Sequence, residues 1–209
     1  MNRNDPFEPF GISYLSPSSI NSFINNLPHW ILTYAHKYRD PFGNPAFWRG
    51  MASEDGICYA IQNPKATVAD AYEVALKKFE AERKAFLKQN KTQYKIIEPK
   101  IAKEKNDLKR YVSAGVPYFR GLEIKDATFQ DKIKLEIEGC PIPIIGYTDI
   151  QYGEVVRDIK TANRMPSEVS DSYARQLSVY AHATKKNSAI VDYVYVTSRE
   201  EKVVSKPIN

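Results

Sequence analysis

The chain of 209 residues is long enough to bury the core of one domain, and 43% of its residues are hydrophobic. Its formal net charge of +5 favours polyanionic partners, although charge alone does not select them. No apolar run approaches the length of a membrane span and the N-terminus has no signal-peptide core, so we expect neither a membrane-spanning nor a secreted protein. We therefore expect a soluble protein of the cytoplasm.

The first half of the chain is predicted to be helical. Residues 1–15 predict an irregular arm, after which Ser16 and Pro17 have the residue types of a helix cap and a first helical position. Apolar residues then recur at helical spacing, and Pro28 is the expected end of this helix. Further helices are predicted at 29–38, 47–61, 67–90 and 98–112, the last ending near Gly115 and Pro117.

The region between residues 65 and 117 carries most of the positive charge. From Lys65 to Arg110 there are 13 Lys or Arg residues and 7 Asp or Glu residues, a net charge of +6. Pairs such as Glu80 and Lys84 are typical of a solvated amphipathic hairpin, whereas lysines on one side would face phosphates. Both interpretations stay open. We predict a single domain, 1–209, in which 65–117 is a basic helical insertion or arch.

After Tyr118 the sequence pattern changes from helical to strand-like. An order of helices, three strands, a helix and a strand predicts a mixed β-sheet with helices packed against it. The expected fold class is therefore α/β of the mixed α+β type. The strands are predicted at 131–139, 143–150, 154–160, 189–197 and 202–205, and the helix between them at 167–184.

The stretch from Gly146 to Lys160 contains the residues with the clearest chemical potential. Its two apolar runs flank residues 151–153, which predicts a β-hairpin with a three-residue connection. Alternation along a strand places Asp158 and Lys160 on one face, and pairing brings Asp149 near Asp158. Two carboxylates and an ammonium then meet at the end of a sheet. Because carboxylate oxygens suit a hard cation such as Mg²⁺, we predict a metal-dependent phosphodiesterase site.

The position of this acidic-x-Lys triplet, rather than the triplet itself, selects the site. An acidic residue stands two positions before a lysine six times in the chain, and three of these triplets lie on predicted helices, where such positions point apart. Only Asp158-Ile159-Lys160 ends an apolar strand with a carboxylate on the partner strand. The alternative is a surface ion pair on a strand.

Four short motifs follow one another along the chain. They are Ser16-Pro17-Ser18-Ser19-Ile20, Arg49-Gly50-x-x-x-Glu54, Gly146-x-x-Asp149 with Asp158-x-Lys160-Thr161, and Tyr173-x-x-Gln176-x-x-x-Tyr180. In this order they resemble the PD-(D/E)XK nuclease superfamily, specifically its RecB-like and phage exonuclease branches. The motifs run from residue 16 to residue 180, although 62–130 contributes nothing diagnostic. The resemblance implies a restriction-endonuclease-like core.

The resemblance also implies a role for each residue of the central motif. Asp149 and Asp158 would be direct ligands of Mg²⁺ or Mn²⁺, and the Ile159 carbonyl would complete the inner shell. Glu54 would approach from its helix, directly or through water. Lys160 would orient the attacking water and stabilise charge on the phosphate, with the metal as Lewis acid. The alternatives are a turn-capping aspartate at Asp149 and a surface carboxylate at Glu54.

The last motif places Gln176 and Tyr180 one helical turn apart, so both can reach the same site. Gln176 would hold Lys160 or a phosphate, and Tyr180 would contact the substrate; the alternative is two ordinary helix residues. We also expect contacts to nucleic acid from five residues, although exposed arginines often have no such role: Ser18, Arg49, Arg157, Thr161 and Arg175.

Departures from the family patterns narrow these expectations. RecB-like members usually carry His where this chain has Glu54, so the match to viral and organellar exonucleases is stronger. Relatives with an iron–sulfur cluster need four cysteines, and this chain has only Cys58 and Cys140, so no such cluster is expected. No ATPase signature is present, and any unwinding must come from a partner protein.

The expected function is a Mg²⁺-dependent DNA exonuclease that hydrolyses phosphodiester bonds with a metal-activated water. Phage-like replication, recombination or DNA degradation would be its setting, inside a bacterial host cell. The alternatives are a structure- or sequence-specific endonuclease of the same fold and a non-catalytic module that binds nucleic acid. DNA with an end is the expected partner and no membrane is expected. A replication or recombination partner protein and a homo-oligomer are left open.

Overall fold

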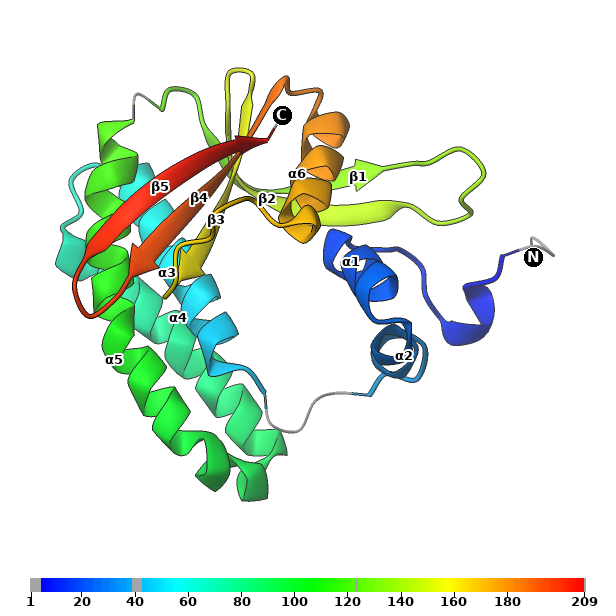
Figure 1. The fold of residues 1–209 in the computed structure, drawn as a ribbon, viewed down its shortest axis with the longest axis horizontal. Helices are drawn as coiled ribbons and strands as arrows, with labels where there is room; N and C mark the ends of the chain where they lie inside the picture. The colour runs from blue at the N-terminus through cyan, green and yellow to red at the C-terminus, as the bar shows by residue number, and fades with distance from the viewer. Residues whose placement is uncertain (1–4, 39–42, 123, 209) are drawn as a thin grey trace.

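A five-stranded mixed β-sheet lies at the centre of the fold, with helices on both faces (Figure 1). The computed structural model describes residues 5–38, 43–122 and 124–208. The strands lie in the order β1-β2-β3-β4-β5, and all neighbours are antiparallel except β3 and β4, which are parallel. This confirms the predicted mixed sheet. Its strands are β1 Thr128–Leu135, β2 Ile144–Tyr152, β3 Val155–Ala162, β4 Ser188–Val196 and β5 Glu201–Ile208.

Most predicted helices are present, with shifted ends. Ser16 caps α1 as expected, in a reciprocal pair of hydrogen bonds with Ser19. The predicted end at Pro28 is wrong, because α1 ends at Asn25 and Pro28 lies in the first turn of the next helix, where its missing N–H is not needed. The helical elements are η1 Glu8–Phe10, α1 Pro17–Asn25, α2 Leu27–Trp30, a π-helical turn η2 Ile31–Ala35, α3 Pro45–Gln62, α4 Val68–Gln89, α5 Lys91–Gly121 and α6 Asp171–Thr184.

Two boundaries differ from the predictions for identifiable reasons. Helix α5 begins at Lys91 and continues through Gly115 and Pro117 to Gly121, because burial of its apolar face outweighs weak local propensity. The connection between β2 and β3 is also shorter than predicted. It consists of residues 153–154, and Gly153 adopts the positive φ of +46° that a two-residue hairpin turn requires. Residues 1–4 of the predicted arm lie outside the described residues.

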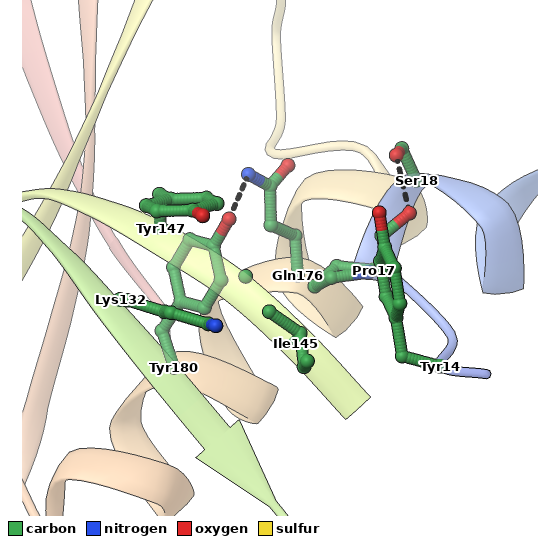
Figure 2. Close-up of a pocket in the computed structure, with 10 residues that line it drawn as sticks. Tyr14, Pro17, Ser18, Lys132, Ile145, Tyr147, Gln176 and Tyr180 are labelled. Carbon is green, nitrogen blue, oxygen red and sulfur yellow. Dashed lines mark hydrogen bonds between the residues drawn. The ribbon is translucent and has the colours of Figure 1, made fainter. Parts of the chain in front are cut away.

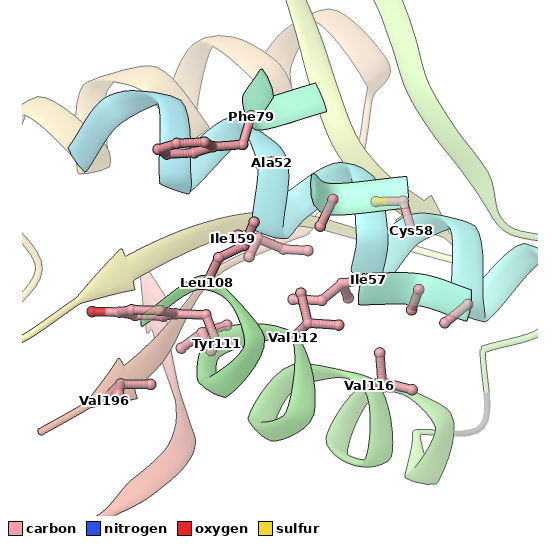
Figure 3. Packing of buried hydrophobic residues seen from close by; sticks show 14 of the residues in the cluster. Ala52, Ile57, Cys58, Phe79, Leu108, Tyr111, Val112, Val116, Ile159 and Val196 are labelled. Carbon is pink, nitrogen blue, oxygen red and sulfur yellow. The ribbon is translucent and has the colours of Figure 1, made fainter. Parts of the chain in front are cut away.

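The larger core lies between the sheet and the layer formed by α3, α4 and α5. Figure 3 shows α5 residues from Leu108 to Val116 facing Ile57 of α3 and Ile159 of β3. The smaller core lies on the opposite face, where Leu177 of α6 packs against β3 and β4. Helix α6 therefore covers one face near β3, while α3 approaches from the other. None of the helices in the described parts of the chain combines enough length and apolar character to cross a bilayer.

Close packing of α3 against α4 depends on a small residue. A Cβ atom at Gly56 would lie 2.6 Å from the backbone oxygen of Ala71 and 3.0 Å from the Cβ of Ala75. We therefore expect Gly56→Ala to lower the free energy of unfolding by about 1–3 kcal/mol, measured by urea denaturation. Gly121→Ala is the control, because nothing lies within 4 Å of its added methyl group. Equal stability of the two variants would contradict this account of the packing.

Candidate active site

The candidate site forms where strands β2 and β3 stop pairing. Their register ends at Ile150 and Arg157, so the next residues, Asp149 and Asp158, lie beyond the paired ladder. The Asp149 carboxylate accepts a hydrogen bond of 2.6 Å from the backbone N–H of Ile159, in place of a carbonyl from β2. Both aspartates are nearly enclosed, with exposed fractions of 7% and 1%. The pairing of β2 with β3 thus ends at two buried aspartates.

The Asp158 carboxylate is contacted from two elements. Lys160 Nζ lies 2.6 Å from its Oδ2 in an ion pair, as the alternation along β3 predicted, yet this oxygen accepts no well-aligned hydrogen bond. Gln176 on α6 donates from Nε2 to the other oxygen, Oδ1, over 3.0 Å. The Lys160 ammonium also lies 5.2 Å from the centre of the Tyr173 ring, within the range of a cation–π contact. The position of Lys160 is therefore set by Asp158 and Tyr173.

Glu54 reaches this group from α3 and is oriented by a residue that the sequence analysis did not identify. Gln130 on β1 donates from Nε2 to Glu54 Oε1 over 3.2 Å and to Asp55 Oδ1 over 3.1 Å. Its φ of +52° is uncommon for a residue with a side chain, and such backbone strain is typical of functional sites. No sequence signal could have identified Gln130, because its hydrogen bond to Glu54 joins residues 76 positions apart.

Burial and the charges of neighbouring acids raise the pKa values of Asp149 and Glu54. Burial raises the pKa of Asp149 well above its usual value, and the charges of Asp158 and Glu54 raise it further. Burial also raises the pKa of Glu54, although its hydrogen bond with Gln130 opposes this and Asp158 adds to it. Burial alone would lower the pKa of Lys160, but the negative charges of Asp158 and Asp149 outweigh it, so the pKa is raised. One ammonium therefore faces three acidic groups.

The residues fit a divalent cation in their chemistry. Among the described residues, no three His, Cys, Asp or Glu side chains are already gathered as a metal-binding group. However, Asp158 Oδ2 is buried and its only close polar partner in the described residues is the Lys160 ammonium, without a well-aligned hydrogen bond. Burial, with the nearby charges of Asp158 and Glu54, raises the pKa of Asp149, so its carboxylate would gain from a cation. Carboxylate oxygens in such a setting are the ligands that Mg²⁺ and Mn²⁺ prefer. Asp149, Asp158 and Glu54 are the candidate ligands.

Gln176 and Tyr180 reach the same site, as their spacing on α6 predicted, but Gln176 bonds Asp158 rather than the expected Lys160. Gln176 Nε2 donates to the Tyr180 hydroxyl over 3.0 Å (Figure 2). It also donates to Asp158. Burial raises the pKa of Tyr180 to about 12, so the side chain is a neutral phenol near neutral pH. A Cβ atom at position 146 would lie 2.7 Å from Tyr180 Cε1, which explains why Gly146 occupies this point of β2.

Two arginines that we expected to contact nucleic acid have partners inside the chain. Arg49 is buried, pairs with Glu104, donates to Thr161 Oγ1 over 3.2 Å and lies above the Tyr111 ring. Arg157 is also buried and contacts both carboxylate oxygens of Asp192, at 2.7 and 2.9 Å. Both guanidinium groups are therefore held by acidic partners inside the chain, with Arg49 Nε buried without a hydrogen-bond partner, and we do not propose them as phosphate contacts.

The remaining three expected contacts lie in different surroundings. Thr161 accepts the hydrogen bond from Arg49 and is therefore part of an internal network. Arg175 on α6 donates to the side chain of Asn21 on α1 over 2.8 Å, so it ties these two helices together. Ser18 is exposed at the start of α1 and lines a pocket beside Gln176. Of the five expected contacts, Ser18 has the surroundings most suited to a ligand.

Comparisons with known proteins add no family assignment. No protein-family model matches the sequence, and no curated protein matches it. A crystal structure of the protein called SSO0001 is similar over a limited region, which covers 40% of this chain and 42% of that one. The two chains are 19% identical there and the TM-score is 0.32, which is too low to support an argument about fold or function.

Proposed function

We propose that this chain is a metal-dependent nuclease of the PD-(D/E)XK type, with a restriction-endonuclease-like core, that hydrolyses phosphodiester bonds in DNA. The observation that carries the proposal is the convergence of Asp149, Asp158 and Lys160 where β2 and β3 separate. A surface ion pair would not need two buried aspartates side by side, one of which raises the pKa of the other. Stability alone gives little reason to gather buried acids in this way, so a catalytic role is favoured.

The side chains divide the chemistry among them. Asp149, Asp158 and Glu54 would hold the cation, which when bound supplies Lewis-acid stabilisation and an activated water. Lys160 has three N–H donors and uses one direction for Asp158, so the others remain available to a water or a phosphate oxygen. Gln176 keeps Asp158 in place through Oδ1 and leaves Oδ2 for the cation and Lys160.

The distribution of unpaired lysines favours a polyanionic substrate. Several cations of α4 and α5 pair with acids, for example Arg83 and Lys105 with Glu80. Within the described residues, five lysines near the turn that joins α4 to α5 are exposed and have no ion-pair partner. In Figure 1 this end of the helical hairpin extends beyond the sheet. Exposed cations without acidic partners support contact between this end of the hairpin and a nucleic-acid backbone. The proposed arch would be this end alone, because other residues of 65–117, such as Phe79 and Leu108, lie in the larger core. The lysines are Lys84, Lys88, Lys91, Lys95 and Lys100.

The test is a gel assay with end-labelled linear DNA and closed circular DNA, each single- and double-stranded. Reactions would contain Mg²⁺, Mn²⁺, Ca²⁺ or EDTA. We expect loss of linear DNA in Mg²⁺ and Mn²⁺ but not in Ca²⁺ or EDTA, because Ca²⁺ accepts looser ligand geometry. Circular DNA should stay intact, as an exonuclease requires. Cleavage of circles would identify an endonuclease, and binding without cleavage in every metal would refute the enzyme.

The hydrogen bond from Gln176 is expected to hold the Asp158 carboxylate in the position that catalysis requires. Gln176→Ala removes the hydrogen bonds to Asp158 and Tyr180, and we expect it to lower the cleavage rate about 10–100-fold, as is typical when the support of a metal ligand is lost. Single-turnover cleavage at saturating enzyme would measure this. Gln89→Ala is the control, since Gln89 is exposed at the end of α4. Unchanged cleavage by Gln176→Ala would refute this role of Gln176.

A further inference from the structure

A pocket of about 360 Å³ opens beside the candidate active site (Figure 2). Gln176 and Tyr180 line it, and Gln176 also binds Asp158, so a ligand in the pocket lies one side chain away from the candidate catalytic acid. The rest of the lining comes from the segment before α1, the start of α1, and strands β1 and β2. Its volume is within the range of small-molecule sites in proteins.

The pocket is held open by contacts on either side of β2. Leu15 donates its backbone N–H to the Pro143 carbonyl over 2.9 Å and accepts from the Ile145 N–H over 2.8 Å. This bridge fixes the segment before α1 against β2. On the face of β2 that α6 covers, the missing side chain of Gly146 allows Tyr180 to pack directly on β2. The backbone hydrogen bonds of Leu15 and the close packing of Tyr180 on Gly146 therefore hold the walls of the pocket in place.

Two tyrosines flank the pocket without contributing to the buried cores. Tyr14 and Tyr147 are exposed to 50% and 58%, and Figure 2 shows them on opposite sides of the opening. Large exposed aromatic side chains beside a pocket are favourable surfaces for nucleobases, because every base has a face that can stack. Each stacked base contributes about 1–3 kcal/mol to binding in proteins that hold single strands. The aromatic content of this rim therefore favours a base as the ligand.

The polar part of the lining suits a phosphodiester. Lys132 lies directly opposite Tyr147 in the β1–β2 register and lines the same pocket. Unlike Lys134, which pairs with Glu136, it has no acidic partner among the described residues. The Tyr180 hydroxyl accepts from Gln176, so its own proton is available to a ligand oxygen. One cation and one neutral donor thus accompany the aromatic rings.

We propose that this pocket binds one unpaired nucleotide of a single-stranded nucleic acid, next to the phosphodiester that is cut. The base would stack on Tyr147 or Tyr14, and Lys132 would contact the phosphate. A base inside a duplex has both faces covered by its neighbours and cannot stack on a tyrosine, so the proposal requires a single strand or a frayed end. The inference rests on the proposed nuclease function and names its substrate class.

Binding to short single strands in EDTA tests the pocket without any cleavage. Each strand, of DNA or RNA, would carry a fluorescent base analogue whose emission falls when it stacks. We expect Tyr14→Ala/Tyr147→Ala to bind about 10-fold more weakly or worse and to lose the quenching, whereas Tyr14→Phe/Tyr147→Phe should retain both. Tyr38→Ala is the matched control, because Tyr38 is exposed and does not line this pocket. DNA and RNA arms identify the preferred strand.

The outcomes separate this inference from the nuclease proposal. If the double alanine variant binds and quenches like Tyr38→Ala, the pocket does not hold a base, whether or not the protein cuts DNA. If wild-type protein binds and quenches the strand yet cuts nothing in Mg²⁺ or Mn²⁺, the nucleotide pocket stands and the nuclease fails. Tighter binding of duplexes than of single strands, with unchanged affinity in the double variant, would also overturn the pocket.

Discussion

Asp158→Asn is expected to lower DNA cleavage by about 10³-fold or more while the protein stays folded and binds DNA. The substitution keeps the shape of the side chain and an oxygen that can accept from Gln176. It removes the charge that faces Lys160 and contributes to the raised pKa of Asp149. Because a repulsion with Asp149 disappears, the unfolding temperature in EDTA should stay within a few degrees of the wild-type value. Lys160→Met should abolish cleavage in the same way.

The measurements are single-turnover cleavage in Mg²⁺, DNA binding in EDTA and thermal unfolding. Asp171→Asn and Lys134→Ala are matched controls, since both residues are exposed and neither has a hydrogen bond or ion pair with Asp149 or Asp158. The controls should cut DNA like the wild type. Near wild-type cleavage by Asp158→Asn, with normal folding, would refute the site. Loss of folding in Asp158→Asn alone would instead indicate a structural role for this aspartate.

Asp192→Ala is expected to lower the free energy of unfolding by about 3–5 kcal/mol, because it leaves the buried Arg157 guanidinium without its counter-charge. Asp192 also accepts from the Ser205 hydroxyl, which in turn bonds the Tyr118 hydroxyl, so one change disturbs a network that joins β3, β4, β5 and α5. Urea denaturation would measure the loss. The exposed pair of Lys134 and Glu136 is the control.

A double variant tests whether Arg157 and Asp192 affect the free energy of unfolding as a pair. Arg157→Met/Asp192→Leu removes both charges, and we expect it to be more stable than Asp192→Ala because no unpaired charge stays buried. The Lys134→Ala control should change stability by no more than about 1 kcal/mol, as is usual for exposed pairs. If Arg157→Ala weakened DNA binding without changing stability, Arg157 would be a phosphate contact, as its sequence position first indicated.

Local geometry explains the parts of the site that could be predicted from the sequence. The cap at Ser16 needs only neighbouring residues, and it forms as expected. Alternation on one strand brings Lys160 to Asp158, and the helical i, i+4 spacing brings Tyr180 to Gln176. Each of these relations spans at most four residues. A residue pattern is sufficient for them, because secondary structure alone sets the distance.

The sequence by itself therefore determined a mixed sheet, the hairpin that carries the two aspartates, and the candidate acids, lysine, glutamine and tyrosine. Only the tertiary structure decided which residues from distant parts of the chain contact one another in and around the site. Gln130 meets Glu54 across 76 positions, and Arg49 meets Glu104 across 55, so Arg49 is turned inward rather than toward a ligand. The length of α5 was likewise set by burial against the sheet. Such contacts depend on how the elements pack, because residues far apart in sequence share no local pattern that encodes their meeting.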